Sequence, residues 1–310
     1  MKPFRFGVNM RAVASRAEWA DKARKLETFG YAVLSLPDHL AELVAPMPAL
    51  ASAAAATTSL RIGTMVLNND LRHPVLVARE AATLDLLSDG RLELGLGAGH
   101  MRSEYDQAGL GFDPGSVRVE RLAEAVAIIK GLLEGQRVTF TGRHYRVTGH
   151  RIHPVPVQRP RPPILIGGSA PRLLTVAAKE ADIVGLTGIT FRRGGTQPDV
   201  SLFRASAADQ QLELVRGAAG DRYPQLELNA LVQRAIVTDE RRRAASELGE
   251  RWSELSVEEI LDSPYVLIGT VDQLVENLQA RRERWGVSYY TIFEPHAEAF
   301  APVVACLAGK

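Results

Sequence analysis

The sequence contains a single cysteine, Cys306, so it can form no internal disulfide, which is typical of a reducing compartment. Neither charge is in excess: 37 Lys and Arg face 36 Asp and Glu, a balance that argues against nucleic acid as a partner. No apolar run approaches the roughly 20 residues that span a bilayer, and the charged residues 2–5 are not followed by the apolar core of a signal peptide. We therefore expect a cytoplasmic protein that binds neither nucleic acid nor membranes.

The apolar fraction of 46% and the charged fraction of 24% are typical of a globular chain with a sizeable core. Short apolar runs alternate with helical patterns along the chain. Strands are expected at residues 4–10, 31–36, 60–67, 92–97, 164–166, 183–186, 226–237 and 289–293. Eight strands, each followed by a helix, predict an α/β fold of the closed (β/α)8 TIM barrel type, with residues 1–310 as one domain. A doubly wound sheet would suit six strands better.

Three segments depart from this alternation. Residues 137–147 alternate in the manner of a small β-hairpin, which we expect to be an insertion. Five prolines between residues 154 and 163 indicate a stiff connector, but strands and helices resume directly after it, so we place no domain boundary there. Residues 187–200, with two arginines and two glycines at 192–195, are too many for a simple connection and are expected to form a lid-like loop.

In such a barrel the active site lies where the strands end, whereas polar residues on the outer helices are usually solvated. Five of the expected strands end in polar residues or glycines. These are Asp38 and His39; Asn68, Asn69, Arg72 and His73; Gly97, Ala98, Gly99, His100 and Glu104; Gly167, Gly168 and Ser169; and Thr187.

Histidines are the residues of this set best suited to proton chemistry. His39 follows Asp38 where Pro37 halts the strand, and an imidazole near neutral pH can move protons or stabilise a negative charge. The alternative is that Asp38 only caps a turn and His39 is a polar loop residue; His73 and His100 have the same alternative. Three histidines and a carboxylate could also bind a metal, but no His-x-His or His-Glu-x-x-His spacing supports this, and we predict no metal site.

Two glycine clusters could bind a ligand. The segment from Gly95 to Gly99 fails the dinucleotide pattern G-x-G-x-x-G, yet its glycines would let a flat ligand approach the backbone closely. Gly167 and Gly168 precede a helix expected to begin near Pro171, where backbone N–H groups and the helix N-terminus favour an anion. A plain strand-to-helix turn is the alternative there.

Taken together, these residues resemble the luciferase-like monooxygenase superfamily, especially the branch that uses the deazaflavin coenzyme F420. The similarity extends from Phe4 to about Pro295, and the order and spacing of its parts carry it. The parts are residues 6–8, 36–39, 61–63, 72–74, 89–99, 164–168, 181–182 and 268–270.

The resemblance implies a deazaflavin across the strand ends, with Asp38 and His39 against the ring and the cofactor phosphate near Gly167. It implies an acid-base residue at the end of the glycine turn, which here is His100 where sugar-phosphate dehydrogenases of the family have Glu. It also implies a cis peptide between Met65 and Val66, behind the ring. We accordingly predict His39 and His100 as catalytic and the following as cofactor-binding: Asp38, Met65, Val66, Asn68, Gly97, Ala98, Gly99, Gly167, Gly168 and Thr187.

The resulting hypothesis is an oxidoreductase that moves a hydride between coenzyme F420 and a small organic substrate. The same fold could instead bind reduced FMN and act as a monooxygenase. A non-catalytic flavin-binding protein and a metal-dependent hydrolase are further alternatives. We expect a homodimer, with the substrate selected by residues 41–47, 102–112 and 187–200.

Overall fold

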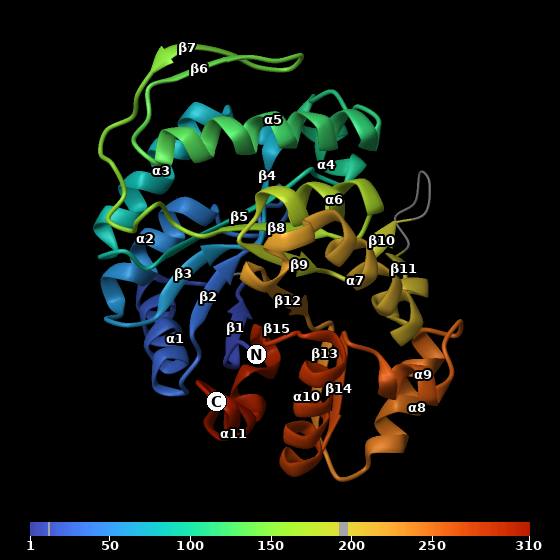
Figure 1. The fold of residues 1–310 in the computed structure, drawn as a ribbon. Helices are drawn as coiled ribbons and strands as arrows, with labels where there is room; N and C mark the ends of the chain where they lie inside the picture. Colours follow the sequence, from blue (N-terminus) through green and yellow to red (C-terminus); the bar gives the residue numbers. More distant parts are fainter. Residues whose placement is uncertain (12, 192–197) are drawn as a thin grey trace.

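The computed structural model describes residues 1–11, 13–191 and 198–310, which form a closed parallel barrel surrounded by helices (Figure 1). Within these residues, eight parallel strands line the barrel in chain order. They are β1 (Arg5–Asn9), β2 (Val33–Leu36), β3 (Arg61–Thr64), β5 (Leu92–Gly97), β8 (Ile164–Gly168), β9 (Ile183–Leu186), β12 (Glu227–Leu231) and β15 (Tyr289–Phe293). The sheet closes where Ile62 of β3 pairs with Leu92 of β5. The predicted (β/α)8 TIM barrel is therefore confirmed.

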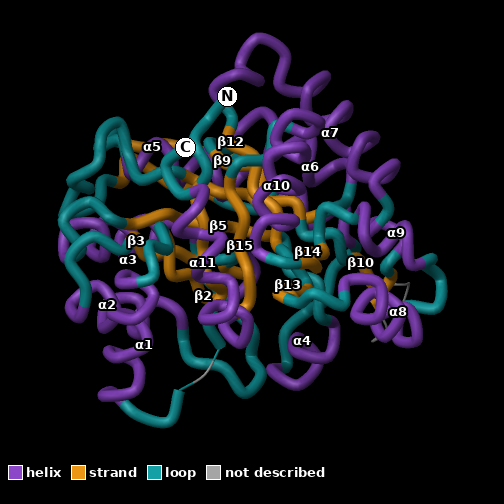
Figure 2. The backbone as a smooth tube through the Cα atoms, turned by 90° about the horizontal axis from the view of Figure 1, so that it is seen from below, coloured by secondary structure: helices purple, strands orange, loops and turns teal. Residues whose placement is uncertain are grey.

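Helices connect the strands and surround them, so that the strands lie in the middle of the molecule (Figure 2). They are α1 (Arg16–Thr28), α2 (Pro46–Ala56), α3 (Pro74–Leu87), α5 (Gly115–Leu133), α6 (Pro171–Glu180), α7 (Ala205–Ala219), α10 (Val271–Trp285) and α11 (Ala297–Leu307). In α3 and α6 a proline occupies the start of the helix, where its missing N–H leaves no hydrogen bond unmade. In the described part of the chain, no helix has the length and apolar character to cross a membrane.

The predicted strand at residues 226–237 is wrong as a single element. β12 ends at Leu231, and β13 (Arg234–Val237) leaves the barrel to pair in parallel with β14 (Val266–Gly269), which the sequence did not predict. The apolar pattern continues through both strands, so nothing in it marks the change of direction. Two short helices, α8 (Arg241–Arg251) and α9 (Val257–Asp262), fill the excursion between β13 and β14.

The strand predicted at residues 60–67 is also divided. β3 ends at Thr64, the peptide between Met65 and Val66 is cis as the resemblance implied, and β4 (Leu67–Asn68) continues along β5. The predicted hairpin is present as β6 (Val138–Thr141) and β7 (Arg146–His150). The short helix α4 (Arg102–Ala108) was not predicted.

The two remaining irregular segments differ in how they are held. In the proline-rich connector, the backbone N–H groups of Val157 and Gln158 donate to the buried carboxylate of Asp85 on α3, at 2.7 and 3.0 Å. In the predicted lid, β10 (Thr190–Phe191) and β11 (Pro198–Asp199) form a short antiparallel pair. The residues between them, 192–197, lie outside the described residues, and so does that part of the lid prediction.

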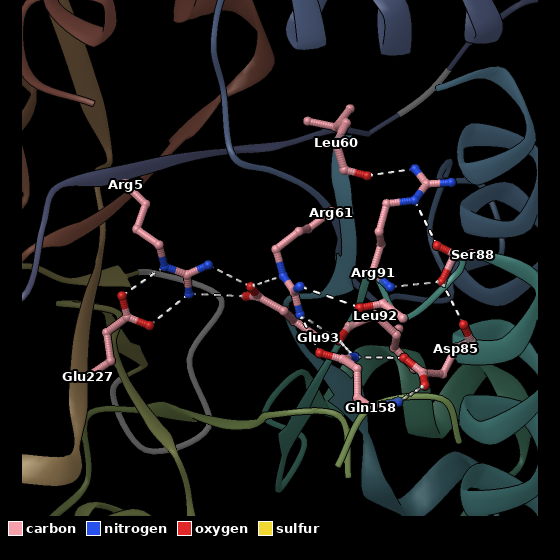
Figure 3. A network of polar contacts seen from close by, with 11 residues as sticks. Arg5, Leu60, Arg61, Asp85, Ser88, Arg91, Leu92, Glu93, Gln158 and Glu227 are labelled. Atoms are coloured by element: carbon pink, nitrogen blue, oxygen red, sulfur yellow. Dashed lines mark hydrogen bonds and ion pairs between the residues drawn. The ribbon is translucent and has the colours of Figure 1, made fainter. Parts of the chain in front are cut away.

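A charged network closes the barrel at the N-terminal ends of its strands (Figure 3). Arg5 donates to Glu227 and to Glu93, and Arg61 donates to the same Glu93 oxygen at 2.7 Å. Burial alone would raise the pKa of Glu93, but the adjacent guanidinium groups of Arg5 and Arg61 lower it below its usual range. These paired charges stabilise the N-terminal end of the barrel, whereas the active site of such a barrel lies at the opposite end, where the strands finish.

Candidate active site at the strand ends

His39 and His100 meet at the C-terminal mouth of the barrel. His39 follows β2 and His100 follows β5, and their rings stand at 88° with centroids 5.3 Å apart. Burial lowers the pKa of His100 to about 4, and the positive charges of His39 and Arg118 act in the same direction. His100 is nevertheless exposed at the mouth, so the lowering comes from the protein atoms and charges packed around one side of the ring, and the ring is a neutral imidazole at neutral pH. Two imidazole rings placed this close together can both take part in the transfer of one proton.

Glu104, in the first turn of α4, faces His39. Its Oε1 atom lies 2.9 Å from His39 Nδ1, and the Glu104 side chain is only 8% exposed. The next residue, Tyr105, anchors α4, because its buried hydroxyl lies 3.0 Å from both Asn68 Oδ1 and Asp70 Oδ2. The short helix therefore brings a buried carboxylate against the histidine that follows β2.

The glycine turn after β5 is shaped by close contacts with α4 and α5. Gly99 has φ +72°, and a Cβ at this position would lie 2.0 Å from the Tyr105 hydroxyl. Arg118 of α5 holds the turn from the other side by donating to the carbonyls of Ala98 and Gly99 at 3.2 and 3.3 Å. The Arg118 guanidinium in turn stacks on the Phe112 ring at 3.9 Å. Only glycine fits this position without displacing α4.

Val66 forms an apolar floor between two strand ends. A Cβ on Gly97 would lie 2.5 Å from Val66 Cγ2, and a Cβ on Gly167 would lie 3.1 Å from Val66 Cγ1. The glycines thus make room for a protein side chain as well as for any ligand. Asn9, at the end of β1, donates to the carbonyl of Met65 at 3.3 Å, and its Oδ1 atom is buried without a partner among the described residues.

A third group of residues makes contacts between the ends of β8 and β9 and the start of α6. The hydroxyls of Ser169 and Thr187 lie 2.8 Å apart beside the N-terminus of α6. Gln211 donates to the Ser169 carbonyl at 3.0 Å. A Cβ on Gly168 would lie 2.1 Å from Leu173 Cδ2, so this glycine is required for packing of α6 as well as for access to the backbone.

Comparison with known proteins agrees with this geometry. The model of the luciferase-like monooxygenase family matches residues 2–289. The chain belongs to the luciferase-like monooxygenase family. Among solved structures, the coenzyme F420-dependent tetrahydromethanopterin reductase of Methanopyrus kandleri superposes with a TM-score of 0.77 over 99% of this chain and 98% of that one, at 18% identity. That likeness shows the fold.

Curated relatives are closer in sequence than this solved structure. The F420-dependent glucose-6-phosphate dehydrogenase of Nakamurella multipartita is 34% identical over 189 residues, which are 58% of this chain and 55% of that protein. The F420-dependent glucose-6-phosphate dehydrogenase of Beutenbergia cavernae is 30% identical over 242 residues, 74% of this chain and 67% of that protein. The chain thus matches little more than half the length of the first of these relatives.

The candidate residues do not all lie in one place. His39, His100, Val66 and Asn68 lie at neighbouring strand ends, whereas His73 caps α3 by accepting from the Val75 N–H at 3.3 Å. The role of His73 is therefore the turn role that the sequence left open. Among the residues that the structure describes, no three or more His, Cys, Asp or Glu side chains form a group that could hold a metal ion.

Sequence reasoning assigned no role to three residues that shape the site. Asn9 ends β1 and satisfies the same strand-end rule as His39, so that rule could have found it. Glu104 was noted as a polar residue past a strand end but received no role, because its partner is 65 positions away (104 − 39) and no spacing links them. Arg118 lies on α5 and carried no signal in the sequence.

Proposed function

We propose that this protein is an oxidoreductase that transfers a hydride between coenzyme F420 and a small organic substrate. The observation that carries the proposal is the perpendicular pair of His39 and His100, which follow β2 and β5 on either side of β3. Membership of the luciferase-like monooxygenase family supports it, as do relatives named as F420-dependent dehydrogenases.

The residues at the mouth fit a tricyclic cofactor with a phosphate tail. Val66, half-buried between Gly97 and Gly167, offers an apolar surface for the flat ring, and the unpartnered Oδ1 of Asn9 is a free acceptor beneath it. Backbone N–H groups at Gly167 and Gly168, beside the N-terminus of α6, suit the phosphate. We propose that Asp38, Met65, Asn68, Ala98, Gly99 and Thr187 complete the binding site. When bound, the deazaflavin supplies the carbon that gives or accepts the hydride.

The chain itself supplies proton transfer and position. Since His39 presents Nδ1 to Glu104, its Nε2 is the ring nitrogen left to exchange a proton with the substrate. With its pKa lowered to about 4, His100 is a neutral ring at neutral pH, which suits it to donate a hydrogen bond or stabilise a developing negative charge more than to act as a strong base. The perpendicular contact between the rings keeps both groups at the same part of the mouth.

Binding titrations test the cofactor directly. The purified protein is titrated separately with F420 and with FMN, each oxidised and reduced, and followed by quenching of its three tryptophans. We expect tighter binding of F420 than of FMN. Micromolar binding of FMN with substrate-dependent oxygen uptake, and no binding of F420, would overturn the proposal in favour of a flavin monooxygenase.

We also propose that residues 1–310 act as one domain and that the protein is a cytoplasmic homodimer. Three leucines near the two ends of α3, Leu76, Leu86 and Leu87, are 44%, 46% and 66% exposed, and a second copy packed along this helix would cover them. Light scattering after gel filtration measures the assembly state. Leu87→Glu should shift a dimer to monomer, whereas Val155→Glu, on the proline-rich connector, should not; a monomeric wild-type protein would refute the dimer.

A further inference from the structure

We propose that Glu104 is a positioning residue for His39: its buried carboxylate accepts the Nδ1 proton of the ring and leaves Nε2 as the nitrogen that exchanges protons. The two groups are in contact, since Glu104 Oε1 and His39 Nδ1 lie 2.9 Å apart, and a small rotation of the ring would align this contact as a hydrogen bond. The carboxylate is 8% exposed and the histidine side chain is 27% exposed, so the contact lies beneath the surface of the mouth.

Neither atom has a hydrogen-bond partner in the described part of the chain, so each keeps its capacity for the hydrogen bond to the other that their 2.9 Å separation allows. The other carboxylates nearby have different partners. Asp38 accepts a hydrogen bond from Arg72, and Asp70 accepts one from Arg121 at 2.8 Å. Glu104 is therefore the carboxylate at the mouth whose polar contact is His39. A buried carboxylate is costly unless it is paired, so this contact explains why the residue is tolerated at this position.

A carboxylate so placed controls two properties of the ring. In a neutral imidazole only one nitrogen carries a proton, and the hydrogen bond made by one nitrogen decides the state of the other. A fixed Nδ1–H leaves the Nε2 lone pair as the proton acceptor. The same contact fixes the orientation of the ring, and with it the 88° contact between His39 and His100.

The competing explanation is that Glu104 only stabilises α4. A carboxylate in the first turn of a helix interacts favourably with the helix dipole, whatever it faces. The two explanations differ in the tautomer of His39, which a purely structural role would not set. They also differ in how substitutions of Glu104 and His39 combine, because a positioning residue has no effect once the ring that it orients is removed.

The tautomer can be read from the free protein without any cofactor. Long-range ¹H–¹⁵N spectra of ¹⁵N-labelled protein report which nitrogen of each of the seven histidines carries a proton. The His39 signals are identified as those lost in His39→Ala. We expect an Nδ1–H tautomer in the wild type, and loss of that preference in Glu104→Ala. An Nε2–H tautomer in the wild type, or an unchanged tautomer in Glu104→Ala, would overturn the proposal.

Glu120 offers a matched control. It faces His144 at 3.5 Å in a second histidine–glutamate contact, away from the mouth on α5 and the hairpin. Glu120→Gln should leave the His39 signals unchanged. Thermal melting of each variant shows whether it is folded. Glu104→Gln provides a second variant, because its amide oxygen can still accept from Nδ1–H and should retain the wild-type tautomer.

A double-mutant cycle then measures coupling in turnover, and this part alone rests on the proposed function. Glu104→Ala should lower F420-dependent kcat by about 10- to 100-fold, the scale of losing a group that orients a functional histidine. Glu104→Gln should lose less. Glu104→Ala should add no further loss to His39→Ala; a full additive loss would mean that Glu104 acts independently and would overturn the proposal. If the wild type fails to use F420, the proposed function falls while the tautomer result still decides the role of Glu104.

Discussion

Asp38 and Arg72 form a two-pronged ion pair at the mouth of the barrel. Arg72 Nη1 lies 2.5 Å from Asp38 Oδ2 and Nη2 lies 3.1 Å from Oδ1, while the backbone N–H of Asn68 also donates to Oδ2 at 3.0 Å. One buried carboxylate thus connects the end of β2 to β4 and to the turn that follows it. Because protein donors already engage both oxygens, the first effect of Asp38 is to hold these loops in place.

Asp38→Asn should therefore affect stability as well as the cofactor. An amide keeps the size of the side chain but places an NH₂ group against donors, and the free energy of unfolding should fall by about 1–3 kcal/mol in denaturant titrations. Asp106→Asn is the control, since its pair with Arg102 is exposed on both sides and should change stability by at most about 1 kcal/mol.

The same variant also separates two roles in function. Loss of F420 affinity in a titration would mean that Asp38 holds the ring, whereas loss of turnover alone would mean that it orients His39. If neither changes, Asp38 is a structural residue and its prediction as cofactor-binding is wrong.

Gly99→Ala should be more disruptive than Gly109→Ala. Both glycines have a positive φ, +72° and +70°, so alanine at either position carries the same left-handed backbone penalty of about 1–2 kcal/mol. A Cβ at Gly99 would also meet Tyr105 and Asn68, whereas nothing lies within 4 Å of a Cβ at Gly109. Gly99→Ala should show the larger loss of stability in thermal melts and, by displacing α4, reduced turnover. Equal effects of the two substitutions would show that Tyr105 does not restrain the turn.

Most of the barrel could be predicted because its signals are local. The bounds of β5, β9 and β15 agree with the sequence prediction, and α6 begins at Pro171 as expected. The strand at residues 226–237 was predicted wrongly because apolar residues recur along the whole segment, and only the tertiary pairing with β14 decides that β13 leaves the barrel.

The site, like the fold, was predictable where its signals are local and not where they depend on tertiary contacts. His39 and His100 were found because each follows a predicted strand, and a barrel places all such residues at one end. The contact between His39 and Glu104 depends on the path of α4, a seven-residue helix without a side-chain N-cap and with little apolar periodicity. The packing of Leu173 against Gly168 was equally hidden, because a glycine in a sequence does not show which atoms occupy the space beside it.

His39→Ala should lower kcat by roughly 100-fold or more, the scale of a lost general acid or base. F420 affinity should change little, because the contribution of a proton-transfer group belongs to the transition state. His73→Ala is the matched control: His73 caps α3 through the Val75 N–H, so its loss should reduce stability modestly and leave kcat within a few-fold. Steady-state kinetics with a cognate substrate decide the matter, and full turnover in His39→Ala would transfer the leading role to His100.

His100 should make the stability of the protein depend on pH between about 4 and 6.5. Burial, with the charges of His39 and Arg118, lowers its pKa from 6.5 to about 4 in the folded state. In this interval the unfolded chain binds a proton that the folded chain does not, so stability rises with pH. Stability is therefore lost as pH falls from 6.5 toward 4.

Substitution of His100 isolates this contribution from the other acid-sensitive groups. Glu27 and Glu124 have lowered pKa values and lose their contribution at lower pH, and half-buried His296 also has a lowered pKa, but all three are unchanged in His100→Gln. Urea unfolding at a series of pH values should show a shallower fall in the free energy of unfolding for His100→Gln than for the wild type between pH 6.5 and 4. Parallel curves would mean that His100 is protonated in the folded protein as readily as in the unfolded chain, and would remove the basis for assigning it a neutral ring at the mouth.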